Sequence, residues 1–245
     1  MPITGVMQDY MKTIYKLQRD RGAVSTSEIA ERLHVSAASA TNMVKRLARL
    51  KLVSYTRYHG FVLAPAGQRI ALEIIRHHRL IELYLARELN ISLDQVDSEA
   101  EKMEHVLSED VEAHMASSLG NPTVDPHGDP IPSVDGTVQE VRYPTLDGLP
   151  AGETGMVTRL SDRSPALLRR LTKVGVLPGV VLKMRARHAT NYAVEISGRD
   201  RTLPREAGTS VYIQWLGAPL RVRSSGGRGS GGATPASGRR RGRRA

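Results

Sequence analysis

Two helical patterns joined by a tight turn, between residues 25 and 50, constrain the possible fold more than any other part of the chain. Ser25 and Glu28 have the spacing of a capping box, which marks the start of a short helix. His34-Val35-Ser36 predicts a turn, and a second helix is expected from about residue 37 to residue 50. Its inner face would consist of Ala40, Met43, Val44 and Leu47. A helix, a tight turn and a second helix form the helix-turn-helix arrangement.

Two short strand-like runs follow, at residues 52–56 and 61–63, around the basic and aromatic turn Arg57-Tyr58-His59-Gly60. A hairpin placed there predicts a winged helix, which favours DNA binding, although winged helices also serve as protein-interaction modules. Short polar residues on the outer face can approach base edges, and later Lys and Arg residues can neutralise phosphates. The residues expected to contact DNA are Thr26, Ser36, Ser39, Asn42, Lys45, Arg46, Arg49, Arg57 and Tyr58.

A stretch in the middle of the chain suits a metal ion. The stretch of residues 99–112, read as a helix, turns Glu101, Glu104 and His105 to one face, because residues three and four apart are neighbours on a helix. Ser108 can cap a further helix from Glu109 to about Leu119. Two carboxylates and an imidazole there suit a divalent ion that prefers oxygen and nitrogen. The alternative is a solvated helical face on which Ser98 and Glu101 form a capping box.

Other potential ligands lie upstream of that stretch. His78 and Glu82 stand one turn apart on a helix expected from residue 65 to about residue 90, and such a pair is more often a surface hydrogen bond than a ligand set. Asp9 lies in the first turn of a helix expected from about residue 8 to residue 19, where its default role is to complement the helix dipole. Groups of His and carboxylate residues rarely accumulate for structural reasons alone, so metal binding is favoured.

The whole pattern predicts a mainly α protein with a small β domain. Residues 121–148 are rich in Pro, Gly and Asp, which indicates a linker, and the spaced strands after it suggest a small barrel. We expect a winged helix-turn-helix domain in residues 1–65 and a helical domain in residues 66–120. The linker is followed by the barrel in residues 149–220 and by a disordered tail rich in Arg, Gly and Ser in residues 221–245.

Composition bounds the environment and the partners. Cysteine is absent, so a metal site must use His, Asp, Glu or Met, and the chain suits a reducing cytosol. There is no long apolar run and no signal-peptide pattern, so we expect a cytoplasmic protein without a membrane segment. The formal charge is +10, but residues 221–245 carry eight Arg and no acidic residue, which leaves +2 for the rest. That tail is either a solubilising extension or a source of sequence-independent phosphate contacts.

The order of these motifs resembles the diphtheria toxin repressor family of metal-dependent transcriptional repressors, over roughly residues 7–217. The segments that carry the resemblance are Asp9–Tyr15, His78–Glu82, Glu99–Ser108 and His127–Pro132. Residues 152–155 and 171–179 resemble the SH3-like domain shared with ferrous-iron transport proteins. The resemblance implies an N-terminal winged helix-turn-helix, an α-helical dimerisation domain and a C-terminal SH3-like β-barrel.

The resemblance also implies which residues bind metal. The primary site would use Asp9, Glu101, Glu104 and His105, and a second or ancillary site would use His78, Glu82 and Asp97. The iron-responsive branch has Met and Cys in place of Asp9 and Glu101, whereas the manganese-responsive branch resembles this chain at both positions. Oxygen donors in place of sulfur favour Mn(II), although Fe(II) also accepts oxygen and imidazole. Lys12 stands where the manganese branch can place a carboxylate, and a cation there would repel a close second ion.

We therefore expect a homodimeric, Mn(II)-activated repressor of metal-homeostasis genes that binds double-stranded palindromic operator DNA. A metal ion joining Asp9 to ligands of the dimerisation helices would fix the orientation of the DNA-binding domain. An Fe(II)-responsive or metal-independent regulator is the alternative within this class. A carboxylate and histidine metalloenzyme is the alternative from another class. We do not expect an enzyme, because the chain lacks the His-Glu-x-x-His pattern and the paired Glu-x-x-His of di-iron bundles.

Overall fold

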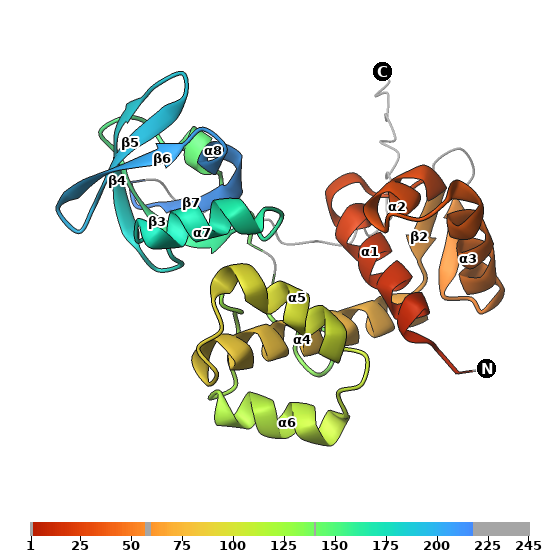
Figure 1. The fold of residues 1–245 in the computed structure, drawn as a ribbon. Helices are drawn as coiled ribbons and strands as arrows, with labels where there is room; N and C mark the ends of the chain where they lie inside the picture. Colours follow the sequence, from red (N-terminus) through yellow and green to blue (C-terminus); the bar gives the residue numbers. More distant parts are fainter. Residues whose placement is uncertain (1, 57–59, 140, 218–245) are drawn as a thin grey trace, which may run out of the picture.

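A computed structural model describes residues 2–56, 60–139 and 141–217, which form an N-terminal unit, a helical unit and a C-terminal β unit (Figure 1). The expected fold class, mainly α with a small β domain, is confirmed. Arg57 and Tyr58, expected at the tip of the wing, and the tail of residues 221–245 lie outside the described residues. Among the described residues, no helix is long and apolar enough to cross a membrane.

The N-terminal unit is a helix-turn-helix with a two-stranded wing. Its elements are α1 (Gly5–Arg21), α2 (Thr26–Arg32), α3 (Ala37–Arg49), β1 (Val53–Thr56) and β2 (Gly60–Leu63). The predicted capping box is present, since Ser25 and Glu28 each satisfy a backbone N–H of the other. Apolar residues of all three helices form one core, which includes Met7, Met11, Ile14, Ile29, Val44 and Leu47. This core fixes α1 against the recognition helix α3.

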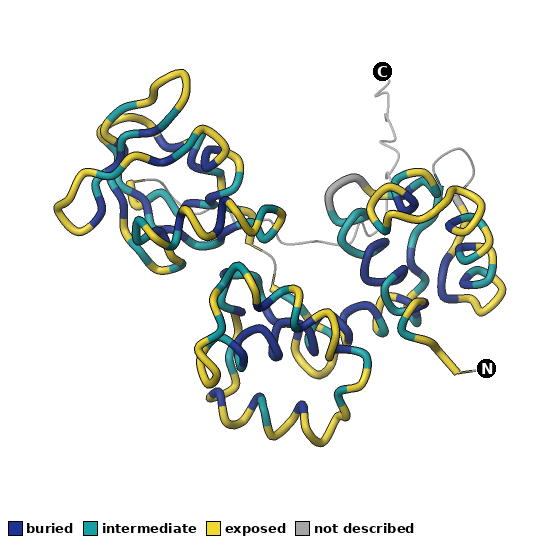
Figure 2. The backbone as a smooth tube through the Cα atoms, viewed as in Figure 1, coloured by how far each residue is buried: buried dark blue, intermediate teal, exposed yellow. Residues whose placement is uncertain are grey.

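Helix α4 (Pro65–Arg87) connects the N-terminal unit to the helical unit. Pro65 suits the first helical position, where a backbone N–H would have no partner inside the helix. The helix packs on α1 at one end and on α5 (Leu93–Met103) and α6 (Glu109–Ser118) at the other. Figure 2 shows it largely buried, and its buried residues include His77, His78, Arg79 and Glu82. Four polar residues buried in one helix need partners, and these partners define the site.

The helix expected from Glu109, capped by Ser108, is present, whereas the helix expected before it ends sooner than predicted. Helix α5 ends at Met103, a turn follows, and α6 begins at Glu109. The Ser108 hydroxyl accepts a hydrogen bond from the Val111 N–H and so begins a new helix. The proposed capping box of Ser98 and Glu101 is also absent, because Ser98 lies inside α5 and donates to the Gln95 carbonyl.

The C-terminal unit is an antiparallel sheet in the order β6-β5-β4-β3-β7. Its elements are β3 (Thr154–Leu160), α7 (Pro165–Lys173), β4 (Val181–Arg187), β5 (Asn191–Ile196), β6 (Arg199–Pro204), α8 (Ala207–Ser210) and β7 (Val211–Trp215). The sequence did not predict β6, which lies at the edge of the sheet. This strand begins with the polar residues Arg199-Asp200-Arg201, which obscure the alternation of apolar and polar residues typical of a strand. Ser197 and Gly198, with φ of 49° and 74°, form the two-residue turn before it.

The segment of residues 121–148 was expected to be a linker. Its described residues contain the short 3-10 helix η1 (Leu146–Gly148) and are otherwise mostly irregular, but they pack against both neighbouring units. The Leu160 N–H of β3 donates to the His127 carbonyl at 2.8 Å. A Cβ at Gly128 would lie 2.0 Å from the Thr158 carbonyl oxygen, so only glycine permits this approach. Asp129 forms ion pairs with Arg79 of α4 at 3.3 Å and with Arg159 of β3 at 3.2 Å. The segment therefore joins α4 to the β unit.

Candidate metal centre and nucleic-acid interface

The expected ligands converge from both units that α4 connects. Asp9 lies on α1 of the N-terminal unit, and His78 and Glu82 lie on α4. Asp97 and Glu101 lie on α5, Glu104 caps the C-terminal end of that helix, and His105 follows in the turn. Ending α5 at Met103 lets the chain turn Glu104 inward, where it is fully buried, while Glu101 stays exposed.

Asp9, Glu104 and His105 form a first group, whose potential ligand atoms all lie within 4.8 Å of one another. His105 Nε2 lies 2.7 Å from Asp9 Oδ1 and 3.5 Å from Glu104 Oε1. Its Nδ1 lies 2.8 Å from the Gln8 Oε1 atom, so the ring can donate there and turn the Nε2 lone pair toward the carboxylates. Asp9 Oδ1 is buried. A buried carboxylate oxygen in contact with an imidazole and near a second carboxylate fits a divalent cation.

His78, Glu101 and Glu104 form a second group, which shares Glu104 with the first. His78 Nδ1 lies 2.5 Å from Glu104 Oε2 and 3.7 Å from Glu101 Oε2. Lys12 of α1 reaches the same carboxylates, with Nζ 2.7 Å from Glu101 Oε2 and 2.5 Å from Glu104 Oε1. The predicted primary and ancillary sites are therefore linked through His78 and Glu104.

The remaining expected ligands lie on the other side of His78. His78 Nε2 lies 3.2 Å from Asp97 Oδ1 and 3.6 Å from Glu82 Oε1. Glu82 also belongs to a buried group that sequence reasoning missed, formed with Asp125 and His127. His127 opens the His127–Pro132 motif, so a signal for it was present, whereas Asp125 lies in a segment without periodicity.

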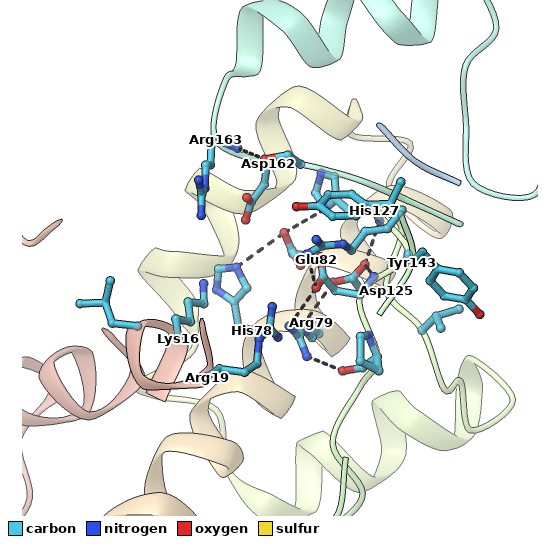
Figure 3. A pocket seen from close by; sticks show the side chains of 18 of the residues that line it. Lys16, Arg19, His78, Arg79, Glu82, Asp125, His127, Tyr143, Asp162 and Arg163 are labelled. Carbon is cyan, nitrogen blue, oxygen red and sulfur yellow. Dashed lines mark hydrogen bonds and ion pairs between the residues drawn. The ribbon is translucent and has the colours of Figure 1, made fainter. Parts of the chain in front are cut away.

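This last group lines a cavity of about 770 Å³ between the three units. Figure 3 shows His78 and Glu82 of α4 and His127 of the joining segment at this cavity, with Lys16 and Arg19 of α1 and Asp162 and Arg163 of the β unit around it. His127 Nδ1 lies 3.4 Å from Glu82 Oε1, and its Nε2 lies 3.0 Å from the Leu93 carbonyl. The imidazole thus ties α4 to the start of α5.

Burial and neighbouring charges raise the pKa of some of these side chains and lower the pKa of others. Burial alone would lower the pKa of His127, but the hydrogen bond and charge of Glu82 outweigh burial and raise it to about 9. Burial raises the pKa of Asp125 to about 8. Burial also raises the pKa of Asp9, whereas contacts with His78 and Lys12 outweigh burial and lower the pKa of Glu104. Before a cation binds, protons and Lys12 thus balance part of the buried negative charge.

The expected DNA-contacting residues lie on the outer side of the helix-turn-helix. Ser36, Ser39, Asn42, Lys45 and Arg49 are exposed, and Thr26 and Arg46 are partly buried. Ser36 caps α3 by accepting the Ser39 N–H at 3.1 Å. Residues Ala40, Val44 and Leu47 on the opposite face of α3 are buried. The polar face of α3 therefore lies opposite the core of the N-terminal unit.

Comparison with known proteins agrees with this arrangement. Residues 3–61 match the N-terminal DNA-binding domain of the iron-dependent repressors, residues 64–133 match their metal-binding and dimerisation domain, and residues 145–214 match the FeoA domain. The iron-dependent repressor IdeR of Mycobacterium leprae is 30% identical over 218 residues, which cover 84% of this chain and 95% of that protein. The chain belongs to the iron-dependent repressor family. The resemblance to metal-dependent repressors inferred from the sequence is thus confirmed.

Other members of the iron-dependent repressor family differ in the metal they are named for. The regulator MntR of Geobacillus kaustophilus is 36% identical over 105 residues, covering 43% of this chain and 74% of MntR. A manganese-dependent transcriptional repressor solved with manganese superposes with a TM-score of 0.78 at 36% identity, covering 86% of this chain and all of that one. The manganese regulator SloR gives a TM-score of 0.67 at 31% identity, covering 88% of this chain and all of SloR. The protein is a DNA-binding, metal-dependent transcriptional repressor.

Proposed function

We propose that this repressor is a homodimer activated by Mn(II), that it binds palindromic operator DNA, and that it controls metal-homeostasis genes. The observation that carries the proposal is the first group, in which Asp9 of the DNA-binding unit faces Glu104 and His105 of the helical unit. A cation held by all three attaches α1 to the end of α5. Because α1 shares a core with α3, that attachment restricts the orientation of the recognition helix.

The donor set supports Mn(II) as the activating ion. Carboxylates and imidazoles surround Glu104, and the chain has no cysteine to supply a thiolate. Hard oxygen donors suit Mn(II), and without sulfur ligands the preference for softer metals is weakened. Fe(II) is the second candidate, since it accepts the same donors and the Mycobacterium leprae relative is named for iron.

The proposed dimer and the proposed palindromic operator have the same two-fold symmetry. Family members carry a dimerisation domain, matched here by residues 64–133. Apolar surface is exposed by Met103 at the end of α5, by Val106 in the turn after it and by Val111 in α6, and Val106 is 82% exposed. A second copy covering such surface would relate two α3 helices by a two-fold axis, which requires a two-fold symmetric DNA site.

Activation is a population shift, so the ion must bind the DNA-competent orientation more tightly than the others. The test is operator binding by the full-length protein, measured by fluorescence anisotropy on duplexes selected from a random pool in Mn(II). Binding is compared in Mn(II), in anaerobic Fe(II) and in chelator. We expect tight binding in Mn(II), weaker binding in Fe(II) at equal free concentration, and loss of specific binding in chelator. Equal affinity in all three conditions would contradict the proposal.

A further inference from the structure

The carboxylate shared by two ligand groups raises the question of how many ions the cluster holds. Glu104 belongs both to the group with Asp9 and His105 and to the group with His78 and Glu101. A carboxylate between two sets of donors is suited to two neighbouring cations, which in two-metal sites lie about 3.5–4 Å apart. The cluster of Asp9, His78, Glu101, Glu104 and His105, here called the shared-carboxylate cluster, has enough donors for such a pair.

One of the two cation positions already has a cation of the protein itself. Lys12 Nζ lies 2.7 Å from Glu101 Oε2 and 2.5 Å from Glu104 Oε1, so it contacts both carboxylates of the second group. Its side chain is 6% exposed, which means that the ammonium is not a solvated surface charge. Lys12 follows Asp9 by three residues on α1, so the helix presents both side chains to the cluster on one face.

We propose that the Lys12 ammonium replaces a second divalent ion, so that the shared-carboxylate cluster binds a single Mn(II). This inference rests on the proposed function. The group of Asp9, Glu104 and His105 then remains for the ion, and in it Asp9 Oδ1 lies 2.7 Å from His105 Nε2. Lys12 and Asp9 both belong to α1, so this helix supplies both the ammonium group and one ligand of the metal ion.

The charges of the cluster support a single ion. The carboxylates of Asp9, Glu101 and Glu104 carry three negative charges when ionised, and Lys12 contributes one positive charge. With His78 and His105 counted as neutral ligands, the net charge is minus two, which one divalent ion neutralises. A second divalent ion would leave an uncompensated positive charge of two beside the fully buried Glu104, which is unfavourable in a poorly solvated site.

The test is the number and spin coupling of Mn(II) ions bound to the full-length protein, by equilibrium dialysis with elemental analysis and by electron paramagnetic resonance. The variants are Lys12→Glu, which supplies a further carboxylate, and Lys12→Met, which removes only the charge. Lys102→Met is the matched control, because Lys102 is 64% exposed and pairs with Glu99 rather than with the cluster. Ions within one cluster broaden each other's signals, whereas an isolated ion keeps its resolved hyperfine lines.

We expect wild type and Lys102→Met to show an isolated ion in the cluster. Lys12→Glu should bind one more ion per protomer and give a broadened, coupled signal. Lys12→Met should bind its first ion at least about tenfold more tightly, because a buried like charge is gone. If Lys12→Glu does not fold, the wild-type spectrum and the Lys12→Met affinity still decide the question.

Three results would overturn the inference: a coupled pair in wild type, no added ion in folded Lys12→Glu, or no tightening in Lys12→Met. The first would leave Mn(II) activation intact, provided that wild-type operator binding still depends on Mn(II). Failure of the proposed function would instead appear as metal-independent operator binding, whatever the ion count. The two outcomes are therefore distinguishable.

Discussion

His105 Nε2 lies 2.7 Å from Asp9 Oδ1, and this contact joins the turn after α5 to the first helix of the DNA-binding unit. The two residues are far apart in sequence and belong to different units. The Asp9 oxygen in this contact is buried. The link between metal binding and DNA binding thus depends on one carboxylate of α1 and on ligands at the end of α5.

Glu104→Gln should remove most of the metal response. Glu104 is fully buried and belongs to both groups of the shared-carboxylate cluster, so an amide there takes one negative charge from each. We expect Mn(II) affinity to fall by at least about tenfold and the Mn(II)-dependent rise in operator affinity to disappear. Isothermal titration calorimetry and anisotropy measure the two effects. Glu99→Gln, which alters only a surface pair with Lys102, should behave as wild type, and an equal loss there would contradict the assignment.

Gln8→Leu should weaken metal binding without removing a ligand. The Gln8 amide oxygen lies 2.8 Å from His105 Nδ1 and orients the ring. Loss of such an orienting partner lowers metal affinity about 10–100-fold. Operator binding should therefore need more Mn(II) but reach the wild-type level at saturation. The exposed Gln95→Leu serves as control. A lower plateau at saturating Mn(II) would mean that Gln8 acts on DNA binding directly.

Asn42→Ala and Lys45→Ala should separate base recognition from phosphate contact. Both residues are exposed on α3, with Asn42 nearer its N-terminal end. Loss of an amide that reads a base edge costs about 1–3 kcal/mol and relaxes sequence preference, whereas loss of a phosphate contact weakens all sequences alike and reduces the salt slope by about 1. Anisotropy over a series of salt concentrations, on selected and scrambled duplexes, checks this. Identical effects of the two substitutions would contradict the assignment of Asn42 to a base edge and of Lys45 to a phosphate.

Gly128→Ala should destabilise the packing of the β unit against α4. Its φ is +93°, and an added Cβ would lie 2.0 Å from the Thr158 carbonyl oxygen. Gly175→Ala is a matched control, since its φ is +85° but no atom lies within 4 Å of the added Cβ. Backbone strain costs about 1–3 kcal/mol in both variants, so a further loss in Gly128→Ala measures the clash. Thermal unfolding should show a larger fall for Gly128→Ala, and equal falls would show that the contact with Thr158 contributes nothing.

The sequence was informative where local chemistry determines structure. The Ser25 and Glu28 capping box, the apolar face of α3 and the first position of Pro65 are local signals, and the structure has all three. The start of α6 was predicted from its Ser108 cap, whereas the end of α5 at Met103 was missed because helical spacing continues across residues 104–108. Likewise, Asp125 joins Glu82 and His127 only through tertiary packing, which no spacing in the sequence encodes.

The position of Lys12 shows the same limit. The sequence places a cation near a predicted metal site, and one expects repulsion of a second ion from charge alone. It does not show that the ammonium reaches Glu101 and Glu104 from α1 across the boundary between two units. The position of the ammonium depends on how α1 packs against α4, and this packing is determined by many contacts between residues far apart in the sequence.

The central claim is that a metal ion held between α1 and α5 sets the affinity for DNA. The most direct measurement is the Mn(II) dependence of operator affinity for wild type and for Asp9→Asn, side by side, by fluorescence anisotropy. Asp9 is the single expected ligand from the DNA-binding unit. We predict that wild-type affinity rises by at least about tenfold from chelator to saturating Mn(II) and that Asp9→Asn shows little rise, even at Mn(II) concentrations at which the variant is loaded. A full rise in Mn(II)-loaded Asp9→Asn, or no rise in wild type, would contradict the account.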